Sequence, residues 1–157
     1  ETLADAVGTV DEDVKPIARG LLATRLTRMT DRTLKAKMKD SDAEVRAAAA
    51  LAIGYKGSPL YRELAAAMRD GNLLVAQNGR DVLEKMLGED LGPKEGASGI
   101  EWYQASKRWE QWIEDWEKWV EHQKKPASGK ESPSEDQAEL QPPSREGPAQ
   151  APKPSFP

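Results

Sequence analysis

A stretch of the chain repeats itself after 30 residues, and this repeat restricts the possible folds more than any other feature of the sequence. Residues 33–52 align with residues 63–82 without a gap, and residues 11–15 match residues 42–46 less fully, with an offset of 31. The best matched pairs are Leu34 with Leu64, Ala36 with Ala66, Met38 with Met68, Asp40 with Asp70, Val45 with Val75, and Ile53 with Leu83. A fixed period of this length is typical of folds in which small units stack on one another.

Each unit has the apolar spacing of two short helices. Leu34 and Met38 lie four residues apart in the first helix. The second helix has apolar residues at Val45, Ala48, Ala49, Ala52 and Ile53. This spacing fits one face of an α-helix, and the alternation of a strand is missing. We therefore expect an all-α chain of helix pairs, with about 10 residues in the first helix and about 15 in the second.

Short sequences at the expected helix ends agree with this division. Ser41 and Glu44 have the spacing of a capping box at the start of a second helix. Residues 57–59, Gly-Ser-Pro, provide a glycine after one helix, then an N-cap serine and a first-turn proline for the next. Gly71-Asn72 predicts another break between helices.

The second helix of the first full unit carries a family resemblance. Residues 39–54 read Lys-Asp-Ser-Asp-Ala-Glu-Val-Arg-Ala-Ala-Ala-Ala-Leu-Ala-Ile-Gly, and Gly-Ser-Pro follows at residues 57–59. This segment resembles the short bacterial HEAT repeats, also called phycobilisome-lyase-type repeats, and the resemblance extends over residues 31–87. It implies an α-solenoid of HEAT-like helical hairpins, in which each unit buries its apolar side against its neighbours.

The same resemblance implies a ladder of side chains that links successive units. In that family an Asp before the second helix and an Arg early in it make the links, and Asp40, Arg46 and Asp70 occupy those places. Ala76 stands where the second Arg is expected, and Asn78-Gly79 places a turn-prone pair inside a helix. The last unit therefore departs from the pattern, as terminal repeats often do.

Composition divides the chain into three parts. We expect a partial HEAT-like solenoid of about two and a half repeats at residues 1–92, and a linker with a tryptophan-rich amphipathic helix at residues 93–125. A disordered tail is expected at residues 126–157, because eight of the 11 prolines lie there and Leu140 and Phe156 are its only large apolar residues. The first unit has an open apolar side, which predicts further repeats on its N-terminal side.

All five tryptophans lie in one segment with helical spacing. They are Trp102, Trp109, Trp112, Trp116 and Trp119, separated by 7, 3, 4 and 3 residues. Ser98 and Glu101 have the spacing of a capping box at the start of this helix. One tryptophan side chain offers about 150 to 250 Å² for burial, so five exceed the apolar patch that a soluble monomer usually exposes. Something must cover this face.

Four coverings are open on the sequence. The simplest is that the helix folds back on the last repeat and caps the solenoid. Self-association or pairing with another helix is the second, because spacings of 3 and 4 are those of a coiled coil. A membrane interface fits the aromatic face but not the mixed charge of the rest of the helix. Stacking on a carbohydrate or a cofactor is the least favoured, because an aromatic stripe at helical spacing usually packs inside the protein.

A basic stretch is the one feature that points to an anionic partner. The candidate basic patch consists of Arg25, Arg28, Arg32, Lys35 and Lys39. No aromatic residue lies among them to stack on a base, and the net charge of the chain is −4, so nucleic acid is not favoured. The simpler interpretation is that these side chains solvate exposed helix faces.

The residue inventory excludes most site types. The chain has no cysteine and a single histidine, His122, so disulfides, thiolate metal sites and histidine metal clusters are excluded within it. It contains no Gly-rich phosphate loop and no serine nucleophile motif, and we predict no cofactor. No apolar run has the roughly 20 residues that span a bilayer, and the compartment is not determined.

The sequence therefore favours a non-enzymatic scaffold that holds another protein on the concave face of a solenoid. One alternative is an enzyme, or a lyase-type enzyme accessory, whose catalytic part lies upstream of Glu1. Another is a homodimerising module that uses the tryptophan helix. The prolines of the tail, including Pro142-Pro143 and residues 154–157, have the composition of a polyproline ligand or of a spacer.

Overall fold

The computed structural model describes residues 14–124, and the described part is all-helical. The expected disordered tail at residues 126–157 lies outside the described residues. The expected partial repeat, which begins at Asp11, lies partly outside them. Within residues 14–124 the elements are the helices α2 (Lys15–Leu26), α3 (Asp31–Lys37), α4 (Ala43–Lys56), α5 (Tyr61–Ala67), α6 (Leu73–Leu87) and α7 (Gly99–Lys124).

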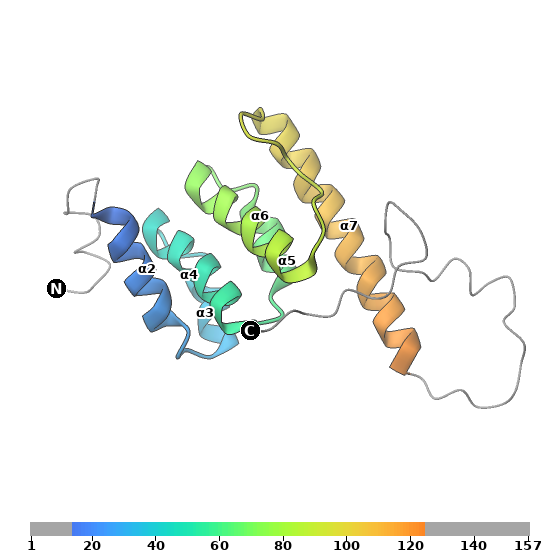
Figure 1. Ribbon diagram of the computed structural model, residues 1–157, viewed down its shortest axis with the longest axis horizontal. Helices are drawn as coiled ribbons and strands as arrows, with labels where there is room; N and C mark the ends of the chain where they lie inside the picture. Colours follow the sequence, from blue (N-terminus) through green and yellow to red (C-terminus); the bar gives the residue numbers. More distant parts are fainter. Residues whose placement is uncertain (1–13, 125–157) are drawn as a thin grey trace, which may run out of the picture.

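The helices form two rows that follow the 30-residue period. Helices α2, α4 and α6 pack side by side in one row, and α3 and α5 each pack against the helix that follows them (Figure 1). Helix α5 begins 30 residues after α3, and α6 begins 30 residues after α4. The first helix of each pair has 7 residues, so the expected length of about 10 was wrong. The chain already turns at Met38 and Met68, which lets Asp40 and Asp70 accept the backbone N–H groups two residues later.

Of the two helix starts predicted here, one has a different cap from the one expected. Asp42, not Ser41, caps α4, because its carboxylate accepts the N–H of Glu44 at 2.9 Å. The side chain of Glu44 is bound to Arg19, so the capping box with Ser41 does not form. Asn72 caps α6 at the break predicted there, accepting the N–H groups of Leu74 and Val75.

The turn between α4 and α5 is only partly as expected. Gly57 ends α4 with a φ of 70°, a left-handed conformation that glycine adopts without a steric penalty. The expected N-cap role of Ser58 was wrong, since Leu60 occupies that position and α5 starts at Tyr61, two residues after Pro59. Ser58 is instead buried, and its hydroxyl donates to Asp31 at 2.8 Å. It ties the turn to the preceding helix pair.

Helix α4 occupies the middle of the structure and contacts α2, α3 and α6. Its alanines at positions 47–50 and 52 are all 0% exposed. Small side chains on several faces let three neighbouring helices approach one helix closely, which explains why this segment is so rich in alanine.

Asn78-Gly79 lies inside α6 without breaking it. A Cβ atom at position 79 would lie 2.8 Å from the carbonyl oxygen of Leu64, so only glycine fits where α6 crosses α5. The side-chain amide of Asn78 donates to the carbonyl of Ala47 in α4 at 3.2 Å. The turn-prone pair thus serves packing between helices, which local sequence does not reveal.

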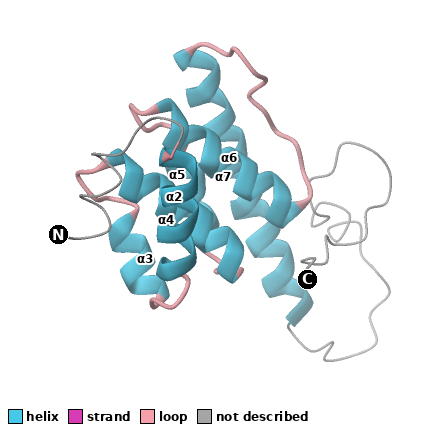
Figure 2. Cartoon of the chain, turned by 60° about the vertical axis from the view of Figure 1, so that its left-hand side comes forward, coloured by secondary structure: helices cyan, strands magenta, loops and turns pink. Residues whose placement is uncertain are grey.

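Helix α7 packs on α5 but runs in the opposite direction. Residues 88–98 lead the chain back beside α6, so that α7 starts at the far end of the structure (Figures 1 and 2). Accordingly Arg62, at the start of α5, pairs with Glu117, whereas Arg69, just after its end, pairs with Glu110. One buried cluster joins residues from α2 through α7, with Trp109 and Ile113 at 0% exposure.

Candidate functional site

The residues of the expected ladder lie together, with Arg46 at the centre. Its Nε and Nη2 donate to the two carboxylate oxygens of Asp70 at 2.7 and 2.9 Å. Its Nη1 donates to the carbonyls of Asp40 and Ser41 at 2.8 and 3.0 Å. The carboxylate of Asp40 instead accepts from Lys37. Arg46 therefore links two units through one carboxylate and two carbonyl groups.

Electrostatics in this ladder favour the charged forms. The hydrogen bond from Arg46 holds the pKa of Asp70 below its ordinary value of 3.8, and the same bond raises the pKa of Arg46. The pKa of Asp40 is lowered as well, mainly by the hydrogen bond from Lys37. Both members of the Arg46–Asp70 pair are largely buried and fully bonded, which suits a structural link and leaves no free group for chemistry.

A second bidentate pair was not predicted. Arg19 of α2 donates through Nε and Nη2 to Glu44 of α4 at 2.6 and 3.0 Å. Arg19 lies one helical turn beyond Lys15, the residue that aligns with Arg46. The pair joins the first two helices of the row, yet the repeat alignment gave no signal for it because its position is shifted.

The tryptophan face is covered from within the chain over most of its length. Trp102, Trp109 and Trp112 are 8%, 0% and 4% exposed, whereas Trp116 and Trp119 are only partly buried. The rings of Trp112 and Trp116 stack at 6.3 Å. The ring of Tyr61, at the start of α5, meets Trp116 edge-on at 5.6 Å, and burial raises the pKa of Tyr61.

Polar contacts fix α7 against α5 and the returning segment. The buried hydroxyl of Ser106 donates to the carbonyl of Ala65 at 2.7 Å. The indole N–H of Trp109 donates to the carbonyl of Gly92 at 3.3 Å. Ser98 and Glu101 form the predicted capping box, in which the N–H of Ser98 donates to the Glu101 carboxylate at 2.7 Å.

Glu110 is the charged centre of the same contact. It pairs with Arg69 of the turn after α5 and with Lys107 one turn earlier in α7. Partial burial raises the pKa of Glu110, but the hydrogen bonds from Lys107 and Arg69 outweigh this effect and leave the pKa below its ordinary value.

The expected basic residues are exposed but do not form one site. Lys35 pairs with Glu63 of the next unit. Arg25, Arg28, Arg32 and Lys39 are exposed and have no ion pair with any residue of the 14–124 segment. Arg25 lies in α2 and Arg32 in α3, so these residues come from different elements.

The outer side of α2 is an exposed apolar face, which we call the α2 face. Val14, Ile17 and Leu21 are 44%, 64% and 63% exposed. They follow one another at helical spacing, on the side of α2 opposite Leu22 and Leu26, which pack in the core.

The repeat alignment identifies the residues of α6 that correspond to the α2 face. Ile17 aligns with Asn78 of α6, whose side chain bonds α4, and Leu21 aligns with Val82. A Cβ atom at Gly54 in α4 would lie 3.0 Å from Val82. In α6 these positions therefore contact the preceding helix of the row, while in α2 they are open to solvent.

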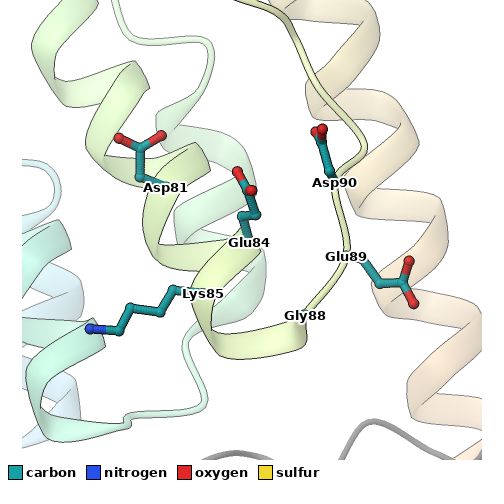
Figure 3. Close-up of a pocket in the computed structure, with 6 residues that line it drawn as sticks. All are labelled: Asp81, Glu84, Lys85, Gly88, Glu89 and Asp90. Atoms are coloured by element: carbon teal, nitrogen blue, oxygen red, sulfur yellow. The ribbon is translucent and has the colours of Figure 1, made fainter.

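The opposite end of the row is charged instead of apolar. A groove of about 450 Å³ lies between α6 and the segment that follows it. Its lining residues are Asp81, Glu84, Lys85, Gly88, Glu89 and Asp90. Figure 3 shows Glu84 between α6 and the segment that carries Asp90, whereas Lys85 points away from that segment. Among residues 14–124 no group of three acidic or histidine side chains could hold a metal ion.

A search of the described helices finds none that is long and apolar enough to cross a membrane. Comparisons of the chain with models of protein families, with curated proteins and with solved structures give no match.

Proposed function

We propose that this chain is a non-enzymatic protein-binding scaffold built from HEAT-like helix pairs, with α7 as the cap of an α-solenoid. Three features support the proposal. The helix pairs recur with the 30-residue period, the Arg46–Asp70 pair joins successive units, and α7 runs against the direction of the stack. The polar groups in these contacts form hydrogen bonds or ion pairs with one another, as expected of a structural framework.

The α2 face is the observation that carries the proposal, and it is better supported than the concave face that the repeat resemblance implies. Matching positions in α6 contact the helix before them through Asn78 and Val82. A partner helix on α2 would be received in the same way. It would present small side chains, as α4 presents Ala47 and Gly54 to α6.

Charge complementarity indicates a second property of the partner helix. Arg25 and Arg28 follow the α2 face at its C-terminal end and are exposed. An acidic side chain near one end of the partner helix would pair with them, chiefly setting orientation and association rate. The partner is thus a helix with a stripe of alanine or glycine and a carboxylate at one end. It is presented by another protein.

The proposal is tested by capture experiments with matched surface variants. Leu21→Glu places a charge in the α2 face, and Tyr55→Glu places the same charge at a tyrosine of α4 that is 59% exposed. We expect a helical partner to be captured by the wild type and by Tyr55→Glu, but not by Leu21→Glu. Equal capture by both variants, or catalytic turnover with no partner, would overturn the proposal.

Homodimerisation through α7 is the second candidate, and the exposed end of the tryptophan face favours it. Trp116, whose ring meets Tyr61 at the start of α5, and Trp119 both stay partly exposed, and α7 continues past the start of α5 (Figure 1). The test is light scattering on the wild type and on a Trp116→Ala, Trp119→Ala double variant. A dimer that becomes a monomer in the variant supports this candidate, and a monomer in both refutes it. The third possibility, an enzyme or enzyme accessory with catalytic residues upstream of Glu1, stays a prediction.

A further inference from the structure

An apolar groove lies between the turn that joins α5 to α6 and the start of α7. It has a volume of about 380 Å³, within the range of pockets that bind small ligands or peptide side chains. Its apolar lining includes Leu73, Ala76, Ala97, Trp102 and Tyr103. An adjoining groove of about 370 Å³ shares Leu73, Ala97 and Trp102 and is also lined by the polar residues Gln77, Arg80, Asp81 and Glu95; we treat the two as one channel and call it the Trp102 groove.

The walls of the Trp102 groove are exposed although the surrounding helices are well packed. Leu73 and Tyr103 are 57% and 52% exposed, and Trp102 between them is 8% exposed. Most of the charged side chains at its edge already have partners, since Arg69 pairs with Glu110, Asp70 with Arg46, and Arg80 with Asp81, while Arg80 also lies over the Trp102 ring. A ligand with apolar and aromatic groups would therefore gain burial here without displacing a salt bridge.

The chain carries a segment of suitable chemistry beyond α7. Residues 154–157 read Pro-Ser-Phe-Pro, with two prolines three residues apart around a phenylalanine. A polyproline helix has three residues per turn, so such prolines lie on one edge and fit grooves lined by aromatic side chains. Lys153 precedes the segment, and Glu95 at the edge of the channel offers the opposite charge.

The connecting chain is long enough to cover the distance to the groove. From Lys124 back to Tyr103 helix α7 spans 21 residues, or about 32 Å at 1.5 Å per residue. The 29 residues from 125 to 153 could reach about 100 Å if fully extended. Residues 154–157 can therefore reach the groove at the start of α7 within the same molecule.

We propose that residues 154–157 of this chain occupy its own Trp102 groove, with Phe156 against Tyr103 and Leu73. The tail is then an internal ligand that competes with outside ligands for the groove. This inference does not depend on the partner surface at α2.

The test is a spin label at the end of the tail, read through the tryptophan indole signals. Since the chain has no cysteine, Ser155→Cys provides a single attachment site in the full-length protein. We expect the nitroxide to reduce the NMR signal of the Trp102 indole N–H by more than half. The signal of Trp119, which lies 17 residues or about 26 Å further along α7, should keep most of its intensity. An undiminished Trp102 signal would refute the proposal.

Matched variants establish that the groove itself is responsible. In the labelled protein, Leu73→Ala together with Tyr103→Ala should restore the Trp102 signal, whereas Tyr55→Ala, at an exposed tyrosine outside the groove, should not. Both variants change exposed side chains, so folding should be preserved. Persistent loss of the Trp102 signal in the double variant would show that the tail lies elsewhere.

A mixture separates binding within one molecule from binding between two. Isotopically enriched protein without a spin label is mixed with spin-labelled protein of natural isotopic abundance. The proposal expects no loss of the Trp102 signal in the mixture, and a loss would assign the tail to a second copy, contradicting the proposal. The variant Leu21→Glu should leave the intramolecular effect unchanged, which separates this test from that of the partner surface.

Discussion

The helix pairs α3–α4 and α5–α6 and the helix α7 bury their apolar sides by different means. Between the pairs the contacts use small residues and a bidentate ion pair, as where Gly54 meets Val82 and Arg46 meets Asp70. Between α5 and α7 the contacts use indole rings, with Trp109 fully buried. The first region buries its apolar surface through many close contacts of small side chains, whereas the second buries it through a few large side chains.

The relative direction of the packed helices accounts for this difference between the two regions. Equivalent helices of successive pairs run parallel and repeat the same neighbours, so small matched residues suffice. Helix α7 runs antiparallel to α5, as the pairs Arg62–Glu117 and Arg69–Glu110 show. It meets surfaces that no other unit meets, and large side chains fill the irregular space. A helix placed this way gives no template for a further unit, which supports the proposed role of α7 as a cap.

The largest effect is expected from Trp109→Ala, which tests whether α7 is part of one cooperative structure. Removing a fully buried tryptophan should lower the free energy of unfolding by about 3–5 kcal/mol. Urea denaturation followed by circular dichroism measures it. The control Trp119→Ala, at a partly exposed position, should cost about 1 kcal/mol or less. Two separate unfolding transitions in the wild type would show that α7 is independent of the helix pairs.

Arg46→Ala tests the ladder between the pairs. It leaves the largely buried Asp70 carboxylate without its main partner, so the free energy of unfolding should fall by about 1.5–3 kcal/mol. Denaturation at low and high salt measures the loss. The control Lys118→Ala removes the exposed pair with Glu114 and should cause no measurable change. Similar losses in both variants would mean that the ladder contributes no more than a surface pair.

Gly79→Ala tests the close approach of α6 and α5. The added methyl group would collide with the backbone of Leu64, so we expect a loss of about 1–3 kcal/mol. Gly20→Ala in α2 is the matched control, because no described atom lies within 4 Å of the added methyl group. That change should increase stability by about 0.5–1 kcal/mol. Equal signs for the two substitutions in a thermal or urea titration would contradict the packing described above.

The smallest effect concerns acid stability. The pKa of Asp70 is lower in the folded chain than its ordinary value of 3.8, mainly because of the bond from Arg46. The unfolded chain therefore takes up this proton first as the pH falls. The stabilisation is complete above 3.8 and is lost as the pH falls through the folded pKa. Asp70→Asn should flatten the decline of stability with pH in this range.

A double variant provides the control for this acid effect. In an Arg46→Ala background the further change Asp70→Asn should alter the pH dependence little, because the interaction is already absent. An acid titration of Asp70→Asn that declines as steeply as the wild type would show that other carboxylates dominate.

Part of the candidate site could be read from the sequence because it depends on neighbours in the chain. The Ser98–Glu101 capping box, the left-handed Gly57 and the break at Gly71-Asn72 are set by residues within four positions of each other. The Arg19–Glu44 pair was missed since its partners lie 25 residues apart and off the repeat register. For the same reason Glu44 was predicted to form a capping box with Ser41, and this box does not form.

By itself the sequence determined an all-helical chain with a 30-residue period and one tryptophan face that needs cover, because helical spacing and repetition are properties of order along the chain. Only the tertiary structure decided that α7 runs back along α5, that Gly79 is required by the carbonyl of Leu64, and that the α2 face stays open. These outcomes depend on which distant segments meet and in which direction. Local patterns of residues carry no record of that choice.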